Sequence, residues 1–289
     1  MDVATRIEGA LNKAVGSAEQ SGCPPRLAAA MRASVFPRGA RVRPRLCHAV
    51  ASACGDDEPG ATEAAGAALE LLHCASLVHD DLPCFDDAAL RRGRPSVHAA
   101  YGQPLAVLAG DALIVLAFQT MARASCSPRR LVRLISTVGA AVGVPFGIVA
   151  GQAWECEDEI DLSRYHRSKT GALFAAATVC GAVAAGVEDA EAWRALGDKI
   201  GEAYQVADDI SDAASDEEEA GKPVGKDAAL GRPSAVIRYG IAGAISHLHE
   251  LVAEGISAMP PCANAHELRR LMEQEARRLV PKRLAQFAA

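Results

Sequence analysis

Clustered carboxylates are the residues of this sequence best suited to chemistry. Four aspartates fall within one short stretch of otherwise apolar sequence: Asp80, Asp81, Asp86 and Asp87. A second group lies far downstream: Asp208, Asp209 and Asp212. Carboxylates held close together repel one another unless a cation lies between them. Mg²⁺ prefers oxygen ligands, typically one or two carboxylates together with substrate phosphates. The residues therefore predict a Mg²⁺-dependent enzyme that acts on a diphosphate, with the two groups brought together by the fold.

Local sequence places both aspartate groups on helices. A helical pattern runs over residues 61–81, and Pro83 should end that helix. The first aspartates would then lie at a helix C-terminus, where the macrodipole disfavours negative charge. Such a placement favours function over stability, and a bound cation would reverse the local electrostatics. In the helix predicted over 192–212, Asp208 and Asp212 project from one face, about 5.4 Å apart along the axis.

The rest of the chain also reads as helices. The 289 residues are 50% hydrophobic but only 4% aromatic, and alanine is abundant. This composition favours helices packed closely through small side chains. Further helices are predicted over 1–20, 26–34, 103–121, 131–149 and 171–187, with two or three more after residue 234. Asp111 interrupts the apolar 103–121 helix and is interpreted as a buried, hydrogen-bonded carboxylate. The prediction is an all-α fold that forms a single domain over residues 1–289.

Basic residues gather locally, although the net charge of −6 argues against a nucleic-acid binder. The two clusters are Arg38, Arg41, Arg43 and Arg45, and Arg91, Arg92 and Arg94. Guanidinium groups match phosphate oxygens, so the first cluster fits a diphosphate site and a solvated charged patch equally well. A lone lysine before an apolar helix, such as Lys169, more often extends toward solvent than acts in catalysis. Residues 221–233, with Lys222, read as a mobile lid.

The cysteines and the N-terminus bear on the compartment. Nine cysteines are scattered without a disulfide-like framework, which favours reduced thiols and a cytoplasmic protein. The N-terminus lacks the apolar region of a signal peptide. The uncharged run from Gly171 to Val187 is short for a membrane span, and a buried core helix is the better interpretation. We expect no membrane span.

Taken together, these motifs resemble the trans-isoprenyl diphosphate synthases, the family of farnesyl and geranylgeranyl diphosphate synthases. The resemblance covers residues 35–240, and the pattern is most similar to bacterial geranylgeranyl diphosphate synthases of carotenoid-type pathways. The segments that carry it are Gly39-Ala-Arg-Val-Arg-Pro44, His79-Asp-Asp-Leu-Pro-Cys-Phe-Asp86, Leu90-Arg-Arg-Gly-Arg-Pro-Ser-Val-His98, Ala109-Gly-Asp-Ala-Leu113, Lys169-Thr-Gly171 and Tyr204-Gln-Val-Ala-Asp-Asp-Ile-Ser-Asp212. It implies long antiparallel helices around a central cavity, with the acidic motifs facing each other across its mouth.

The resemblance also implies roles for individual residues. Asp80, Asp81 and Asp86 would hold Mg²⁺ from one side, and Asp208, with Asp209 and Asp212, from the other, for three ions in all. The allylic diphosphate would be contacted by Arg91, Lys169 and Lys222, with Thr170 and Gln205 at the reacting end. The diphosphate of isopentenyl diphosphate would be bound by Arg43, His73 and Arg92. This chain has Ala40 where the family usually has a lysine for that substrate, and Arg41 or Arg38 are the candidate replacements.

The implied reaction condenses isopentenyl diphosphate with dimethylallyl, geranyl or farnesyl diphosphate and releases diphosphate. In the family, a bulky aromatic five positions before the first aspartate stops growth at fifteen carbons. Here that position is Ala75, followed by Ser76, so we expect an open tunnel and a C20 product, with Leu72 a candidate floor. The resemblance further implies a homodimer, for which the helix at 102–121 could supply the interface.

Several alternatives compete with this interpretation. A farnesyl diphosphate (C15) synthase would share the mechanism. A non-catalytic regulatory homologue is favoured only by Ala40. A class I terpenoid cyclase would carry a different second metal motif in place of Asp208-Asp209-x-x-Asp212. A di-iron bundle needs suitably placed Glu-x-x-His pairs, which the sequence lacks. A purely structural helical protein would leave the charged clusters unexplained.

Overall fold

The central element of the fold is an alanine-rich helix, α10 (Ala172–Ala184), of which every residue but the first is buried. It packs against α3 (Val42–Cys54), α4 (Pro59–Asp80), α7 (Pro128–Val142) and α11 (Arg194–Ala214). A Cβ atom on Gly181 would lie 2.4 Å from the carbonyl oxygen of Cys47, so glycine permits the close approach of α10 and α3. The uncharged run is therefore a core helix, as predicted.

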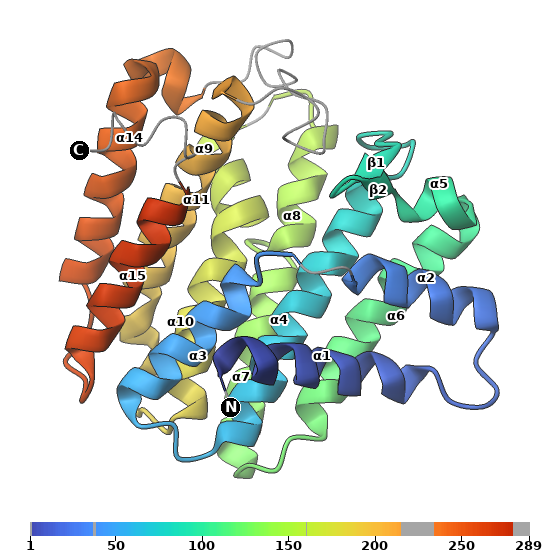
Figure 1. Ribbon diagram of the computed structural model, residues 1–289, viewed down its shortest axis with the longest axis horizontal. Coiled ribbons are helices and arrows are strands. Elements are labelled where there is room, and N and C mark those ends of the chain that lie inside the picture. The colour runs from blue at the N-terminus through green and yellow to red at the C-terminus, as the bar shows by residue number, and fades with distance from the viewer. Residues whose placement is uncertain (1, 37–38, 160, 215–233, 280–289) are drawn as a thin grey trace.

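The computed structural model describes residues 2–36, 39–159, 161–214 and 234–279, and these are almost entirely helical (Figure 1). The helices α14 and α15 lie on the opposite side of the molecule from α2, α5 and α6 (Figure 1). A two-stranded antiparallel hairpin follows α4. The remaining elements are α1 (Val3–Ala18), α2 (Pro25–Val35), β1 (Leu90–Arg91), β2 (Arg94–Pro95), α5 (Val97–Tyr101), α6 (Gln103–Ala122), α8 (Ile148–Ala153), η1 (Trp154–Cys156), α9 (Leu162–His166), η2 (Arg167–Gly171), η3 (Ala190–Trp193), α14 (Ala235–Ser257) and α15 (Ala265–Leu279).

The all-α prediction is confirmed, and most helix positions agree with the sequence pattern. The helix predicted over 61–81 is α4, which ends at Asp80, with Asp81 as its C-cap. The prediction of a single helix over 131–149 is wrong. The structure divides it into α7 and α8, because Pro145 lies in the segment between them and proline cannot donate a helical hydrogen bond. This break matters for the site, because it sets the direction in which α8 runs.

The apolar helix α6 is only partly buried. It packs against α4, but Val107, Leu108 and Val115 are exposed. By length and composition alone it is apolar enough to cross a membrane. The expectation that Asp111 is buried is wrong: its carboxylate is 60% exposed and lies 3.6 Å from His79 Nε2. An apolar neighbourhood in the sequence indicated burial, but the apolar residues that share the Asp111 face of α6 lie at the surface, whereas those on the other face are buried.

Candidate functional site

The first acidic motif is shaped by the loop that ends α4. The backbone N–H of Asp86 donates to the Asp80 carbonyl at 2.9 Å, and the N–H of Ala88 donates to the Asp81 carbonyl at 3.2 Å. The N–H groups of Phe85 and Asp87 both donate to the Leu82 carbonyl. These bonds satisfy carbonyls that a helix C-terminus leaves without partners. They also turn the chain back, so that Asp86 returns to the end of α4 beside Asp80.

Burial dominates the electrostatics of this motif. It raises the pKa of Asp80 above its ordinary value, although Lys169 and Gln152 act in the opposite direction. It also raises the pKa of Asp81, against the hydrogen bond and charge of Arg91. Arg91 donates to Asp81 through Nε at 2.9 Å and through Nη2. The carboxylates are thus held in positions where their negative charge is unfavourable, which is the environment that a cation would relieve.

A single turn of π-helix, η2, connects the two acidic motifs. The ammonium of Lys169 lies 3.5 Å from Asp80 Oδ1, in the first motif. The next residue, Thr170, donates its hydroxyl to Gln205 Oε1 at 3.1 Å, one helical turn before Asp209 in the second motif. Rare π-helical turns are frequent at functional sites. Two groups that are far apart in the sequence are therefore joined through two consecutive side chains.

The second acidic motif lies near the C-terminal end of α11. Asp208 is exposed, whereas Asp209 and Asp212 are partly buried. Asp209 accepts a hydrogen bond from Gln205 Nε2 at 3.2 Å and another from the backbone N–H of Ala235 at 2.8 Å. Asp209 therefore orients Gln205 and holds the start of α14. This contact gives it a positioning role in addition to the predicted catalytic one.

Three side chains that the sequence interpretation missed complete this network. Gln152 donates to Asp80 Oδ1 at 2.9 Å and to the Ser76 carbonyl at 3.2 Å. Glu155 accepts from Lys169 Nζ at 2.6 Å and from the Tyr165 hydroxyl at 2.5 Å. The available signal was weak, because these residues lie in a polar segment without a clear helical pattern. Their spacing on α8 and η1 places Gln152 and Glu155 near one helical face.

The structure brings together Arg43, His73 and Arg92, the residues predicted to bind the second diphosphate. Arg43 is buried over the ring of Phe174, with 4.7 Å from Cζ to the ring centroid. Its Nε is buried and makes no hydrogen bond to any of the residues that the structure describes. Burial, together with Arg43 and Arg92, lowers the pKa of His73 well below its usual range. A Cβ on Gly39 would lie 2.6 Å from Arg92 Cζ, so that guanidinium packs against bare backbone. A buried, unpaired guanidinium nitrogen fits an anionic ligand.

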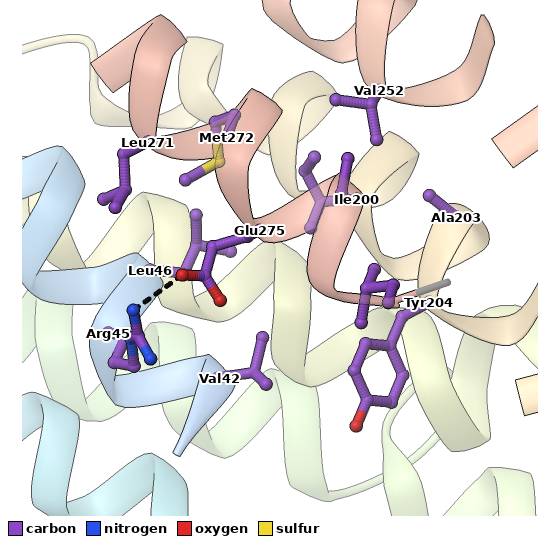
Figure 2. Close-up of a pocket in the computed structure, with 12 residues that line it drawn as sticks. Val42, Arg45, Leu46, Ile200, Ala203, Tyr204, Val252, Leu271, Met272 and Glu275 are labelled. Atoms are coloured by element: carbon purple, nitrogen blue, oxygen red, sulfur yellow. Dashed lines mark hydrogen bonds and ion pairs between the residues drawn. The ribbon is translucent and has the colours of Figure 1, made fainter. Parts of the chain in front are cut away.

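Two other arginines of the first basic cluster, Arg41 and Arg45, make contacts within the fold. Each of the three nitrogens of Arg41 donates within the protein: Nε to Glu8 at 2.9 Å, Nη1 to Glu70 at 2.8 Å and Nη2 to the Val35 carbonyl at 2.8 Å. The structure therefore argues against Arg41 as a replacement for the lysine absent at Ala40. Figure 2 shows that Arg45 instead pairs with Glu275 of α15, at 2.6 Å, beside an apolar pocket that Tyr204 also lines.

Some predicted site residues need separate description. Ala75 and Leu72 are buried in the hydrophobic core, and Ser76 is half-buried and donates to the His73 carbonyl. Lys222, the predicted lid at 221–233 and Arg38 lie outside the described residues. The chain-length role of Ala75 and the lid role of the loop remain predictions.

The donor set suits Mg²⁺ with a bound diphosphate better than a metal held by protein alone. Within the described ranges, no group of three or more His, Cys, Asp or Glu side chains could hold a metal ion. Mg²⁺ usually binds one or two carboxylates and completes its shell with water and substrate phosphates. Buried carboxylates with raised pKa values, next to Lys169 and Arg91, provide such a partial set of ligands.

Comparisons with known proteins agree with this geometry. A model of the polyprenyl synthetase family matches residues 24–267. The geranylgeranyl diphosphate synthase of Cereibacter sphaeroides is 51% identical over 281 residues, 97% of each chain. That of Rhodobacter capsulatus is 50% identical over the same shares. A geranyltransferase from Helicobacter pylori, solved in complex with magnesium and isoprenyl diphosphate, superposes with a TM-score of 0.77 at 31% identity, covering 94% of this chain and 96% of that one. The chain therefore belongs to the polyprenyl synthetase family.

Proposed function

We propose that this protein is a Mg²⁺-dependent prenyltransferase that condenses isopentenyl diphosphate with allylic diphosphates to form geranylgeranyl diphosphate, releasing diphosphate. The observation that carries the proposal is the junction at η2, where Lys169 meets Asp80 and Thr170 meets Gln205. This junction brings the two acidic groups together near a pocket that Arg91, Arg92 and Arg94 line. A reaction that separates a diphosphate from a carbon chain requires such an arrangement of metal ligands and cations. Two relatives named geranylgeranyl diphosphate synthase match 97% of this chain, at 51% and 50% sequence identity.

The residues would divide into two diphosphate sites. Asp80, Asp81 and Asp86 would hold Mg²⁺ on the allylic diphosphate from one side, and Asp208 with Asp212 from the other, three ions in total. Bound Mg²⁺ would neutralise the charge that builds on the departing diphosphate. Lys169 and Arg91, already positioned beside these carboxylates, would add cationic contacts to the same oxygens. Arg43, His73 and Arg92 would bind the diphosphate group of the second substrate, isopentenyl diphosphate.

The reaction needs no protein nucleophile. The carbon–oxygen bond of the allylic diphosphate ionises, and the double bond of isopentenyl diphosphate attacks the resulting cation. A proton then leaves, and the released diphosphate accepts it as the base. Thr170 and Gln205, which are hydrogen-bonded to each other at 3.1 Å, would line the reacting end. The helix α10 packs against η2, and nearly all of its residues are buried and apolar. This apolar packing would keep water away from the cation.

Arg41 offers a test of which arginines bind substrate. Arg41→Met should lower the free energy of unfolding by about 3–5 kcal/mol, because it removes the ion pair of the buried Glu70 carboxylate and a further ion pair with the partly buried Glu8. The KM for isopentenyl diphosphate should nevertheless stay within about twofold of the wild-type value. Denaturant unfolding and steady-state kinetics at a temperature where the variant is folded would measure both. A tenfold rise in that KM with the fold intact would return Arg41 to the substrate site.

We further infer a homodimer built on α6. Its residues Val107, Leu108 and Val115 are apolar and exposed, and Val144 and Phe146, between α7 and α8, are 72% and 74% exposed. Exposed apolar residues that gather on one face commonly mark an association surface. Light scattering of the purified protein, with Leu108→Glu as the disrupting variant, tests the assignment. A monomeric wild-type protein would refute it.

A product assay tests the proposed function directly. Purified protein would receive Mg²⁺, labelled isopentenyl diphosphate and, separately, dimethylallyl, geranyl or farnesyl diphosphate, and the dephosphorylated products would be sized. We expect a C20 alcohol from all three primers. A C15 product would keep the chemistry and make the protein a farnesyl diphosphate synthase. No elongation by folded protein would overturn the proposal in favour of a regulatory homologue, with Ala40 as the reason.

A further inference from the structure

Glu155 is a partly buried carboxylate beside Lys169 to which the proposed reaction assigns no role. It lies on η1 and is 14% exposed. A single oxygen, Oε1, accepts from Lys169 Nζ at 2.6 Å and from the Tyr165 hydroxyl at 2.5 Å. The ring of Tyr165 also faces the Lys169 ammonium, at 5.6 Å from its centroid. Glu155 is thus the nearer of two carboxylates that compete for one cation.

The other competitor is Asp80. The Lys169 ammonium lies 3.5 Å from Asp80 Oδ1, which is beyond a normal hydrogen bond, but 2.6 Å from Glu155. Asp80 Oδ1 receives its hydrogen bond from the neutral amide of Gln152 instead. An amide can be displaced from a carboxylate by a metal ion more easily than a buried ammonium, because it carries no net charge.

The backbone fixes this geometry. A Cβ atom on Gly151 would lie 2.4 Å from the backbone nitrogen of Lys169, so α8 is pressed against η2 at this point. Glu155 follows Gly151 by four residues and therefore projects from the same helical face. The close contact holds the Lys169 backbone, and Glu155 then selects the direction of its long, flexible side chain.

We propose that Glu155 is a positioning residue that holds the Lys169 ammonium away from Asp80 and so keeps the Asp80 carboxylate accessible to Mg²⁺ and diphosphate. When the diphosphate arrives, Lys169 can exchange its hydrogen bond with Glu155 for one with a phosphate oxygen, and its ion pair with the metal ligand Asp80, at 3.5 Å, is too long to be a hydrogen bond that must first break. Without Glu155, the ammonium would move onto Asp80 and compete with the metal. This inference rests on the proposed function of Asp80 and Lys169.

The test measures the affinity for Mg²⁺ by calorimetry in the presence of inorganic pyrophosphate. This readout does not depend on turnover. Glu155→Gln should weaken Mg²⁺ binding about tenfold, as loss of a supporting contact around a metal site commonly does. Glu155→Asp should restore part of the affinity, and Tyr165→Phe should lower it less. Glu157→Gln, which removes an exposed carboxylate two residues away, should leave it unchanged.

A double variant separates positioning from a simple loss of negative charge. In a Lys169→Met background no ammonium remains to occupy Asp80, so adding Glu155→Gln should change Mg²⁺ affinity by less than about twofold. A tenfold loss in that background would overturn the proposal, as would unchanged binding in Glu155→Gln itself. If Glu155→Gln does not fold, Glu155→Asp and Tyr165→Phe carry the same comparison. A wild-type protein that binds Mg²⁺ with pyrophosphate but forms no product would contradict the proposed function alone.

Discussion

Replacing Asp80 with asparagine is expected to lower kcat/KM for prenyl transfer by about a thousandfold, the scale on which loss of a major charge-stabilising group reduces catalysis. Asparagine keeps the shape of the side chain and its hydrogen bond with Gln152, but it removes the charge that would hold Mg²⁺. Steady-state kinetics over a range of Mg²⁺ concentrations would show the loss, and high Mg²⁺ should recover little of it.

The same substitution should leave the protein at least as stable as the wild type. Burial raises the pKa of Asp80 even with Lys169 nearby, so the folded state disfavours the ionised carboxylate. Between the ordinary pKa and the raised one, the folded protein binds more protons than the unfolded chain. Stability is therefore lost as pH rises through that window, and the whole penalty is present above the raised pKa. Asparagine carries no such penalty, and thermal unfolding without Mg²⁺ should show an equal or higher Tm.

Asp87→Asn is the matched control for this prediction. Asp87 lies in the same loop, but its carboxylate is 70% exposed and lies 3.8 Å from His98 Nε2. Its backbone has φ of 46°, a conformation that asparagine adopts readily. We expect kcat/KM within about threefold of wild type for this variant. An Asp80→Asn enzyme that kept a tenth of wild-type activity would contradict the assignment of Asp80 as a metal ligand.

Which parts of the fold the sequence could predict depends on whether the signal was local. The helix boundaries at Asp80 and Gln103 follow from proline positions and apolar spacing, and the structure agrees with them. The break near Pro145 was overlooked, although its cause is local. Burial was harder, because it depends on which surfaces meet. Asp111 was predicted to be buried from its apolar neighbours, but Val107, Leu108 and Val115, which share its face of α6, are themselves exposed.

The site divides in the same way. Asp80, Lys169 and Gln205 were identified as parts of motifs, and the structure brings them together. The partners of Arg41 could not be read from its own cluster, because Glu8 and Glu70 come from two other helices. Glu155 was missed for a related reason. One glutamate in a polar segment looks like any solvated residue until the fold places a buried ammonium beside it.

Replacing Ala75 with phenylalanine is expected to change the main product from C20 to C15. Ala75 is 1% exposed on α4, five residues before Asp80. If the growing chain lies along this face of the helix, a benzyl group would fill the space that the last five carbons need. If instead the site were solid core, the added ring would cost about 1–3 kcal/mol through overpacking and leave the product unchanged. Product sizing together with thermal unfolding separates these two outcomes.

Leu77→Phe is the control variant, because it adds bulk to the same helix at a position other than Ala75. Leu77 lies two residues after Ala75, on roughly the opposite side of α4. It lines a pocket with Phe36 and Tyr101 that also reaches the site residues Asp81, Arg91 and Arg92, so the control concerns product length and not rate. A larger side chain there should leave the C20 product in place, although it adds comparable bulk only two residues away. A C15 product from Leu77→Phe would mean that the chain runs along the opposite face of α4. A C20 product from a stably folded Ala75→Phe enzyme would move the floor of the tunnel deeper, toward Leu72 on the preceding turn.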